Sequence, residues 1–252
     1  MAEAIIKGIA SKYAGNIIVS EPRDERRAYL EKTYHIKTSP RNKDAAGDAD
    51  TIILAVKPQD MEKVLDEVSV VISREKTVVS IAAGITLSYL SARLETKKIV
   101  RIMSNTPALI QEGMSVMSMC ECIQDKDIAV VKDIFMSIGR LLTLPEKYMD
   151  AVTALSGSGP AFFAYFTEAT IEGATRMGLS RDDATTLAIQ TLLGTARLLD
   201  TGMSPLKLRE MVTSPKGTTA AGLAVFDEKG LKEIAAAAIS AATERAKELG
   251  KS

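Results

Sequence analysis

The sequence has little histidine and little cysteine. His35 is the sole histidine, and the two cysteines, Cys120 and Cys122, stand two positions apart in a C-x-C arrangement. A zinc site needs more ligands than this pair, and the histidine is far from the cysteines in the sequence. These residues give no reason to expect a metal site, and we expect the two cysteines to have a structural role.

An excess of charge of either sign is also absent. The 252 residues include 32 basic and 32 acidic side chains, so the formal net charge is zero. This balance gives no reason to expect nucleic acid or an anionic membrane as a partner. No apolar run is long enough to span a bilayer, and the N-terminus, with Glu3 and no extended apolar core, does not fit a signal peptide. We expect a cytoplasmic protein.

A glycine-rich phosphate loop is missing as well. Nucleotide-binding α/β folds open with a strand, a G-x-G-x-x-G loop and a helix, but here the helical pattern of residues 2–13 comes first. Without that strand its neighbours lose main-chain hydrogen bonds, and each buried unpaired amide costs about 1–3 kcal/mol. We expect that the natural protein begins about ten residues earlier. The alternative is a shortened form with poor cofactor binding.

The first half of the chain alternates between apolar strands and helices. The patterns predict strands at 16–20, 51–56, 77–81 and 98–103, with 115–119 and 140–144 as further candidates, and helices at 2–13, 23–32, 60–71, 87–94 and 125–137. Such alternation indicates an α/β fold with a parallel sheet that is covered on both faces. We place the end of this domain near Leu144, so that it covers residues 1–145.

The second half, residues 146–252, shows no strand pattern. A long apolar helix is predicted at 158–177, and Gly178 after it suits a left-handed stop. Ser180 and Ser204 are typical N-terminal caps of two further helices, and helices follow at 218–226 and 231–249. The chain is therefore expected to be an α/β domain followed by an all-helical domain.

The predicted helix at 158–177 is apolar nearly all round. It carries Phe162, Phe163, Tyr165 and Phe166 among small residues, so it should be buried on every side. A small helical domain has little interior to cover it. We therefore expect a second subunit to pack against this helix, and the alternative is that neighbouring helices of the same chain suffice.

Three short segments have the composition of a binding site. AVKPQ (55–59) and SIAAG (80–84) follow predicted buried strands, and ligands of open α/β sheets bind at the carboxyl ends of the strands. SPKGTT (214–219) is a turn that leads into a helix, where free N–H groups and the helix dipole favour a carboxylate. Tight packing is the alternative for the second segment, and a well-capped helix is the alternative for the third.

Together these segments resemble the pyrroline-5-carboxylate reductase family. The resemblance rests on AVKPQ (55–59), SIAAGIT (80–86), RIMSNTPALIQEG (101–113), DAVTALSGSGPAFF (150–163) and VTSPKGTTAAGL (212–223), and it spans essentially the whole chain. It implies a Rossmann-like dinucleotide-binding domain, here without its first strand, and a helical domain that interlocks with a second subunit in a homodimer or a higher oligomer. It further implies reduction of 1-pyrroline-5-carboxylate to L-proline, the last step of proline biosynthesis, with NADPH, or sometimes NADH, as hydride donor.

The resemblance also implies where the ligands bind. The implied cofactor-binding residues are Ser20, Arg23, Asn42, Val56, Lys57, Ala82 and Ala83, and the implied substrate-binding residues are Glu146, Ser214, Gly217, Thr218 and Thr219. Ser20 and Arg23 would lie near the adenosine ribose or its 2′-phosphate, which Glu21 opposes. Thr219, as the catalytic residue, would hydrogen-bond the ring nitrogen of the substrate. Lys216 departs from the family, in which a glycine is common at this position.

Two other functions remain open from the sequence. A β-hydroxyacid dehydrogenase has a similar architecture, but it relies on a catalytic lysine in the helical domain, where this chain has SPKGTT (214–219). The second is a catalytically impaired, dimerising remnant of a reductase, which would follow from a genuine loss of the glycine-rich loop. Cofactor titration separates such a remnant from an active reductase.

Overall fold

The structure is a computed structural model that describes residues 1–250, apart from the side chain of Ala14. The chain divides into two compact units. Unit 1 comprises Met1–Ser158 and the C-terminal residues from Ser240, and unit 2 comprises Gly159–Ile239. Within residues 1–250, no helix combines the length and the apolar character that crossing a membrane requires.

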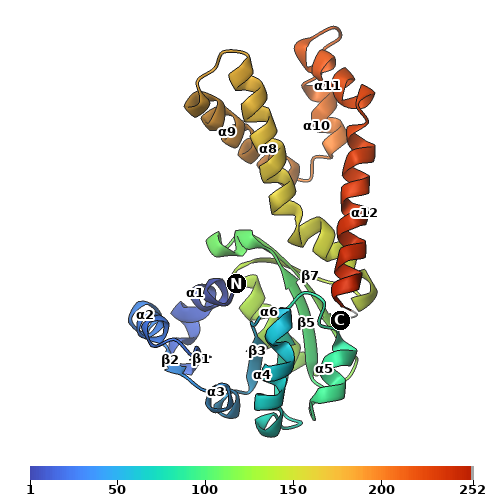
Figure 1. Cartoon of the computed structure of the whole chain (residues 1–252). Coiled ribbons are helices and arrows are strands. Elements are labelled where there is room, and N and C mark those ends of the chain that lie inside the picture. Colours follow the sequence, from blue (N-terminus) through green and yellow to red (C-terminus); the bar gives the residue numbers. More distant parts are fainter. Residues whose placement is uncertain (251–252) are drawn as a thin grey trace. The chain divides into compact units, whose positions relative to one another are not determined.

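The strands that the structure describes in unit 1 form two sheets (Figure 1). The strands are β1 (Ile18–Ser20), β2 (Lys37–Ser39), β3 (Thr51–Leu54), β4 (Thr77–Ser80), β5 (Ile99–Ser104), β6 (Gly113–Met119) and β7 (Gly139–Thr143). β1 and β2 pair in parallel as a small sheet, and the other strands form a sheet in the order β3-β4-β5-β6-β7. Within residues 1–250, β1 and β3 are not paired with each other.

The predicted parallel sheet is present, but one pair of its strands is antiparallel. β5 and β6 are antiparallel, whereas β3, β4 and β5 run parallel, as do β6 and β7. Residues 105–112 connect β5 to β6 and include a short 3-10 helix, Thr106–Ile110. A parallel crossover needs about a dozen residues or more, so this connection is too short for one and reverses the chain direction instead.

Helices connect most successive strands of unit 1 along the chain (Figure 1). They are α1 (Ala2–Tyr13), α2 (Asp24–Tyr34), α3 (Asn42–Asp48), α4 (Met61–Val68), α5 (Leu87–Arg93), α6 (Asp125–Met136) and α7 (Met149–Val152), which a π-helical segment, Thr153–Gly157, follows. The predicted helices at 2–13, 23–32, 60–71, 87–94 and 125–137 are confirmed within one to three residues at most ends. β2 and α3 were not predicted, because both are short and polar.

Two apolar clusters hold the larger sheet between its helices. Val79 of β4 belongs to the cluster with Ile5 of α1 and Phe135 of α6, whereas the adjacent Val78 belongs to the cluster with Leu65 of α4 and Leu90 of α5. Successive residues of a strand point to opposite faces, so the run of β-branched residues in β4 serves both clusters. Each fully buried side chain of this kind contributes about 1.5–3 kcal/mol.

Unit 2 is helical, as predicted. It contains α8 (Gly159–Arg176), α9 (Arg181–Asp200), α10 (Pro205–Met211), α11 (Thr218–Glu228) and the first part of α12 (Leu231–Leu249), whose end belongs to unit 1. The predicted caps are confirmed, because the Ser180 hydroxyl accepts a hydrogen bond from the Asp183 N–H at 3.1 Å and the Ser204 hydroxyl accepts one from the Lys207 N–H at 3.2 Å.

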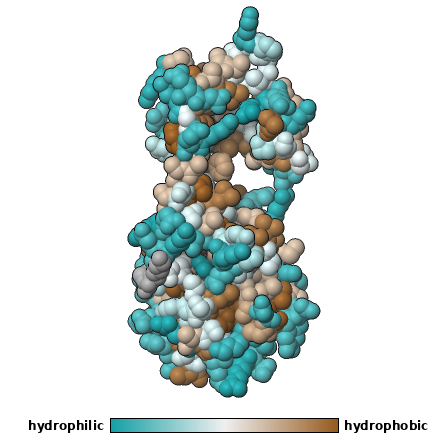
Figure 2. Space-filling model, turned by 90° about the vertical axis from the view of Figure 1, so that its right-hand side faces the viewer, coloured by the Kyte–Doolittle hydropathy of each residue, from teal (hydrophilic) through white to brown (hydrophobic). Residues whose placement is uncertain are grey.

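Large apolar side chains are exposed on unit 2 (Figure 2). On α8 the exposed fraction is 63% for Phe163 and 75% for Tyr165, and Leu187, Ile189 and other apolar residues of α9 are also exposed. Within residues 1–250, neighbouring helices of the same chain therefore leave α8 uncovered along part of its surface, so the alternative that they suffice to bury it is wrong. Apolar area of this extent on one chain is typical of a surface that associates with another protein.

Candidate functional site

Predicted cofactor-binding residues meet at one edge of the larger sheet. Val56 and Lys57 follow β3, and Ala82 and Ala83 follow β4; the two strands are parallel neighbours whose last residues are register partners. The two segments therefore leave the sheet side by side. Lys57 is exposed, whereas Ala82 is buried and its N–H donates to the hydroxyl of Ser80 at 3.3 Å. A cation and small side chains at the carboxyl ends of parallel strands suit a dinucleotide.

Gly84, next in the same segment, has a packing role. Its φ of +79° is unfavourable for residues with a side chain, and a Cβ there would lie 2.8 Å from the main-chain oxygen of Leu249 at the end of α12. The tight-packing interpretation is therefore correct for the glycine of SIAAG. The two alanines before it remain predicted neighbours of the nicotinamide.

Ser20 and Asn42 are brought into direct contact. Ser20 ends β1 and Asn42 begins α3, and the Ser20 hydroxyl donates to Asn42 Oδ1 at 2.8 Å. The Asn42 amide in turn donates to Glu67 Oε2 of α4 at 2.7 Å. The three side chains form a hydrogen-bonded chain from the small sheet to α4, so the structure places the two predicted adenosine contacts together at the end of β1.

Arg23 lies near this pair in sequence but is bound to Glu21. The guanidinium donates from Nε to Glu21 Oε1 at 2.9 Å and from Nη2 to Oε2 at 3.1 Å, and the Arg23 N–H also donates to Oε1 at 3.1 Å. The guanidinium hydrogen bonds hold the pKa of Glu21 below its usual value, despite an opposing effect of burial. Glu21 is therefore ionised at neutral pH and competes for the cation that a 2′-phosphate would need.

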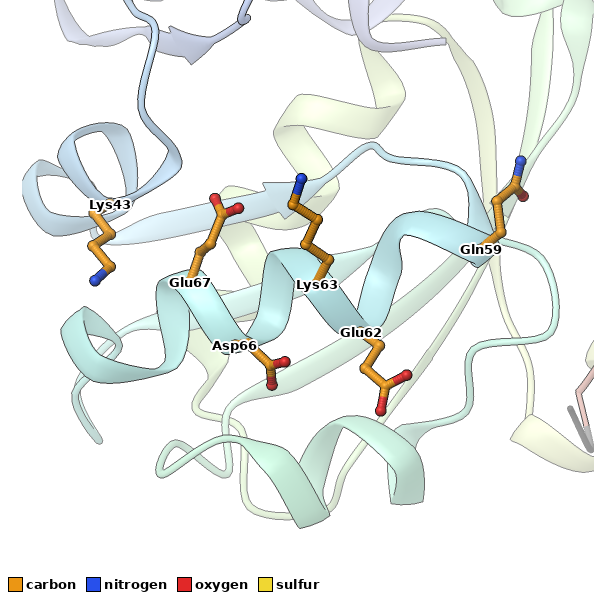
Figure 3. A pocket seen from close by; sticks show the side chains of 6 residues that line it. All are labelled: Lys43, Gln59, Glu62, Lys63, Asp66 and Glu67. Atoms are coloured by element: carbon orange, nitrogen blue, oxygen red, sulfur yellow. The ribbon is translucent and has the colours of Figure 1, made fainter.

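An open cavity of about 530 Å³ adjoins the Ser20–Asn42–Glu67 chain. Its lining residues are Lys43, Gln59, Glu62, Lys63, Asp66 and Glu67. Figure 3 shows that Glu62 and Asp66 point to one side of α4 and that Lys63 and Glu67 point to the other. The polar groups do not converge on one point, and cations alternate with carboxylates, so this cavity has no defined ligand geometry of its own.

Glu146 is held by a buried arginine of the sheet. Arg101 of β5 is 5% exposed, and its Nη1 donates to Glu146 Oε1 at 3.1 Å, while Nη2 lies 3.9 Å from Asp150 Oδ1. Glu146 Oε1 also accepts from the Leu87 N–H at 2.8 Å, at the start of α5. These contacts place the carboxylate beside the segment that follows β4, which contains Ala82 and is predicted to adjoin the nicotinamide.

Sequence reasoning missed Arg101. A signal was available, because Arg101 interrupts the apolar pattern of IVRIM (99–103), and a charged residue in a central strand is seldom buried without a partner. Its neighbours across the sheet are Ser80 of β4 and Ser118 of β6, which are also buried. A polar row thus crosses the sheet, and its central residue, Arg101, binds the carboxylate of Glu146.

The turn at 214–219 belongs to unit 2. The Gly217 N–H donates to the Ser214 oxygen at 3.1 Å, and Gly217 is the N-terminal cap of α11. Its neighbour Lys216 has a φ of +59°, in the left-handed region. Since Gly217 has no side chain, no side-chain cap bond forms, and the first N–H groups of α11, those of Thr218 and Thr219, remain available. The well-capped-helix alternative is therefore wrong at this helix.

Two family models match the chain. Residues 1–84 match the model described as NADP oxidoreductase coenzyme F420-dependent, and residues 146–249 match the model described as pyrroline-5-carboxylate reductase dimerisation. A Rossmann-like α/β unit with a matching NADP oxidoreductase model, followed by a helical dimerisation unit, defines an NAD(P)H-dependent oxidoreductase.

Relatives narrow this class to one family. A pyrroline-5-carboxylate reductase of Synechocystis sp. is 42% identical over 100% of this chain and 95% of the relative. The chain belongs to the pyrroline-5-carboxylate reductase family. The solved reductase from Coxiella burnetii has a TM-score of 0.94 and 32% identity, covering 100% of this chain and 95% of that one. The Plasmodium falciparum reductase, solved with NADP bound, has a TM-score of 0.86 and 30% identity, with 98% and 94% covered.

Proposed function

We propose that this chain reduces 1-pyrroline-5-carboxylate to L-proline with NADPH, as the last step of proline biosynthesis. The observation that carries the proposal is the start of α11, where the N–H groups of Thr218 and Thr219 lack a side-chain cap. An uncapped helix N-terminus attracts a carboxylate, and the substrate carries one. The names of relatives along the whole chain support the same reaction. No comparable observation favours the dehydrogenase or the catalytically impaired remnant.

The residues present fit the adenosine half of a dinucleotide. Ser20 and Asn42 offer a hydroxyl and an amide at the carboxyl end of β1, and Arg23 offers the cation that a 2′-phosphate requires. The contact between Arg23 and Glu21 must be released or shared when a phosphate binds. We therefore propose NADPH as the preferred donor and NADH as a usable one.

In the reaction, bound NADPH supplies a hydride to the carbon of the C=N bond. The chain holds the acceptor in place and needs no strong acid, because a protonated imine accepts the hydride without forming an amide anion. Thr219, through its hydroxyl, hydrogen-bonds the ring nitrogen, and the main-chain amides of Thr218 and Thr219 bind the carboxylate together with Ser214. Gly217 lets the turn lead into α11 without a side chain in the way. Glu146, in unit 1, is the remaining residue that the resemblance implies in substrate binding. Correct placement of two reactants supplies several kcal/mol, up to about 7–11 kcal/mol in favourable cases.

The exposed apolar surface of α8 and α9 supports a homodimer. Phe163, Tyr165 and Leu187 are exposed in one chain, and residues 146–249 match the dimerisation model. Burying this surface against a second copy removes apolar area from water, which stabilises the dimer by about 25 cal/mol per Å² of buried apolar surface. Sedimentation of the purified protein tests the dimer, and a monomer at micromolar concentration would contradict it.

The experiment that tests the function is a steady-state assay of NADPH oxidation with 1-pyrroline-5-carboxylate. Thr219→Ala should lower kcat/KM about tenfold, because one hydrogen bond to the substrate contributes about 1–1.5 kcal/mol. Thr185→Ala on α9 is the matched control, since the Thr185 hydroxyl donates to the Arg181 oxygen of its own helix. Its kinetics should be unchanged.

Unchanged kinetics of Thr219→Ala would rule out its catalytic role. A dimer that binds no cofactor would instead support the remnant, and the reductase function would then be abandoned.

A further inference from the structure

Cys120 and Cys122 form a dithiol on the surface of unit 1. They lie in the turn between β6 and α6, where Cys120 is half-buried and Cys122 is exposed. The two sulfur atoms are 2.9 Å apart. Both sulfur atoms also lie within hydrogen-bonding distance of the main-chain oxygen of Lys97, Cys120 at 2.5 Å and Cys122 at 2.9 Å. The turn thus directs both side chains to one point.

The surroundings favour thiol chemistry over a metal site. Within residues 1–250, no third cysteine, histidine, aspartate or glutamate joins the pair as a candidate metal ligand. A tetrahedral zinc or iron–sulfur site needs about four such ligands. Two converging thiols without further ligands are instead suited to becoming a disulfide, because the second sulfur stands next to any bond that the first one forms.

We propose that Cys120 and Cys122 form a reversible intramolecular disulfide by exchange with a low-molecular-weight disulfide. The thiolate of the exposed Cys122 attacks one sulfur of the reagent, and the S–S bond of the reagent breaks to release one thiolate. The Cys120 thiolate then attacks the Cys122 sulfur of this mixed disulfide and displaces the second thiolate. The two cysteines are oxidised by two electrons, the reagent is reduced to two thiols, and these take up the two protons that the cysteines lose.

Main-chain geometry is compatible with this closure. The hydrogen bond from the Cys120 N–H to the Ile99 oxygen, at 3.3 Å, continues the β5–β6 pairing and does not involve the sulfur atoms. Lys98 stays bound to Asp127 of α6 at 3.2 Å. Oxidation removes the two S–H groups, whereas the main-chain hydrogen bond and the Lys98–Asp127 ion pair do not involve the sulfur atoms. None of these contacts involves a proposed cofactor-binding or substrate-binding residue.

The pKa of Cys122 bears on the rate of the first step. The hydrogen bond with Cys120 raises this pKa above its usual value, and burial acts in the same direction. The thiolate is the attacking species, so exchange at neutral pH is slow relative to that of an activated cysteine. A slow reaction that ends in a closed disulfide distinguishes this pair from a reactive catalytic thiol.

The test uses the wild-type protein, Cys120→Ser and Cys122→Ser, each equilibrated with mixtures of oxidised and reduced glutathione. The chain has no other cysteine, so intact mass and maleimide labelling after denaturation report on this pair alone. On oxidation, the mass of the wild-type protein should fall by two hydrogen atoms, and both maleimide-labelling sites should be lost. The protein should carry no glutathione and form no disulfide between chains. Dithiothreitol should restore both labelling sites. Each single variant should instead keep one glutathione.

A second measurement asks whether the fold positions the pair. The ratio of oxidised to reduced glutathione at half-oxidation is compared for folded wild type and for wild type in denaturant. We expect the folded protein to need a ratio about tenfold lower, because its sulfur atoms are already adjacent. Equal or higher ratios for the folded protein would overturn the proposal. Wild type that retains glutathione adducts, links two chains or stays reduced would overturn it as well.

Discussion

Replacing Glu21 should strengthen the preference for NADPH over NADH. In the structure Glu21 accepts three hydrogen bonds from Arg23, the residue proposed to bind the 2′-phosphate. The Glu21 side chain is 18% exposed, and that of Arg23 is 73% exposed. Glu21→Gln keeps the size of the side chain but removes its charge. Arg23 is then free to turn toward a phosphate, and that phosphate no longer meets a nearby carboxylate.

The size of the effect follows from two contributions. Breaking an exposed ion pair before the phosphate binds costs up to about 1 kcal/mol, and the variant avoids this cost. Repulsion between a carboxylate and a nearby phosphate contributes about 1 kcal/mol more in a well-solvated site. NADH carries no 2′-phosphate, so neither the breaking of the ion pair nor the repulsion affects its binding much. The sum of about 2 kcal/mol corresponds to about a thirtyfold gain in the ratio of the NADPH and NADH affinities.

Binding titrations of both nucleotides to wild type and Glu21→Gln measure this ratio. A second, pH-based readout uses NADP⁺, which tolerates acid. The pKa of Glu21 is lowered in the folded protein by Arg23, so the carboxylate is charged above that pKa and loses its charge as the pH falls through it. The advantage of the variant should therefore disappear in acid. An unchanged nucleotide ratio at neutral pH would refute the placement of the 2′-phosphate at Arg23.

Further predictions concern stability and assembly. Lys216→Gly should raise the free energy of unfolding in urea by about 0.5 kcal/mol. The variant relieves left-handed strain of about 1 kcal/mol, which exceeds the cost of the added flexibility of the unfolded chain. As a control, Lys207→Gly in α10 should lower the free energy of unfolding by about 1 kcal/mol. Arg101→Met should lower the free energy of unfolding by about 2 kcal/mol. The loss is smaller than for a fully buried ion pair, because the side chains of Glu146 and Asp150 are 31% and 30% exposed. An unchanged free energy of unfolding would contradict a stabilising role of this ion pair. Tyr165→Glu should shift dimers to monomers in sedimentation, and an unshifted dimer would exclude α8 from the interface.

The fold was predictable where burial and capping act locally. The strands at 51–56 and 77–81 are continuous apolar runs, and the serine caps mark the starts of α9 and α10. β2 and α3 were missed because three-residue and seven-residue polar elements have no periodic pattern, and tertiary contacts stabilise them instead. β6 runs antiparallel to β5 because the connection between them is too short for a parallel crossover. The apolar pattern of a strand gives no information on its direction.

The site was predictable as segments but not as contacts. The pattern placed 55–59 and 80–84 at strand ends, and parallel pairing of β3 and β4 brings these ends together. The hydrogen bond between Ser20 and Asn42 joins residues far apart in the sequence, and no local pattern reports it. The ion pair between Arg101 and Glu146 likewise depends on how the chain after β7 returns to the sheet.

Lys216 shows how a departure from a family pattern acquires a physical meaning. The resemblance alone says that glycine is common at this position. It does not say whether the lysine matters through its added charge or through the lost flexibility of the backbone. A φ of +59° shows that the backbone adopts the left-handed conformation that glycine accommodates without steric cost. The turn into α11 thus keeps its shape with a lysine, at a cost in stability. If that strain limits how closely the turn can enclose a carboxylate, Lys216→Gly should also lower the KM for the substrate, and an increase in KM would instead assign the ammonium group to the binding site.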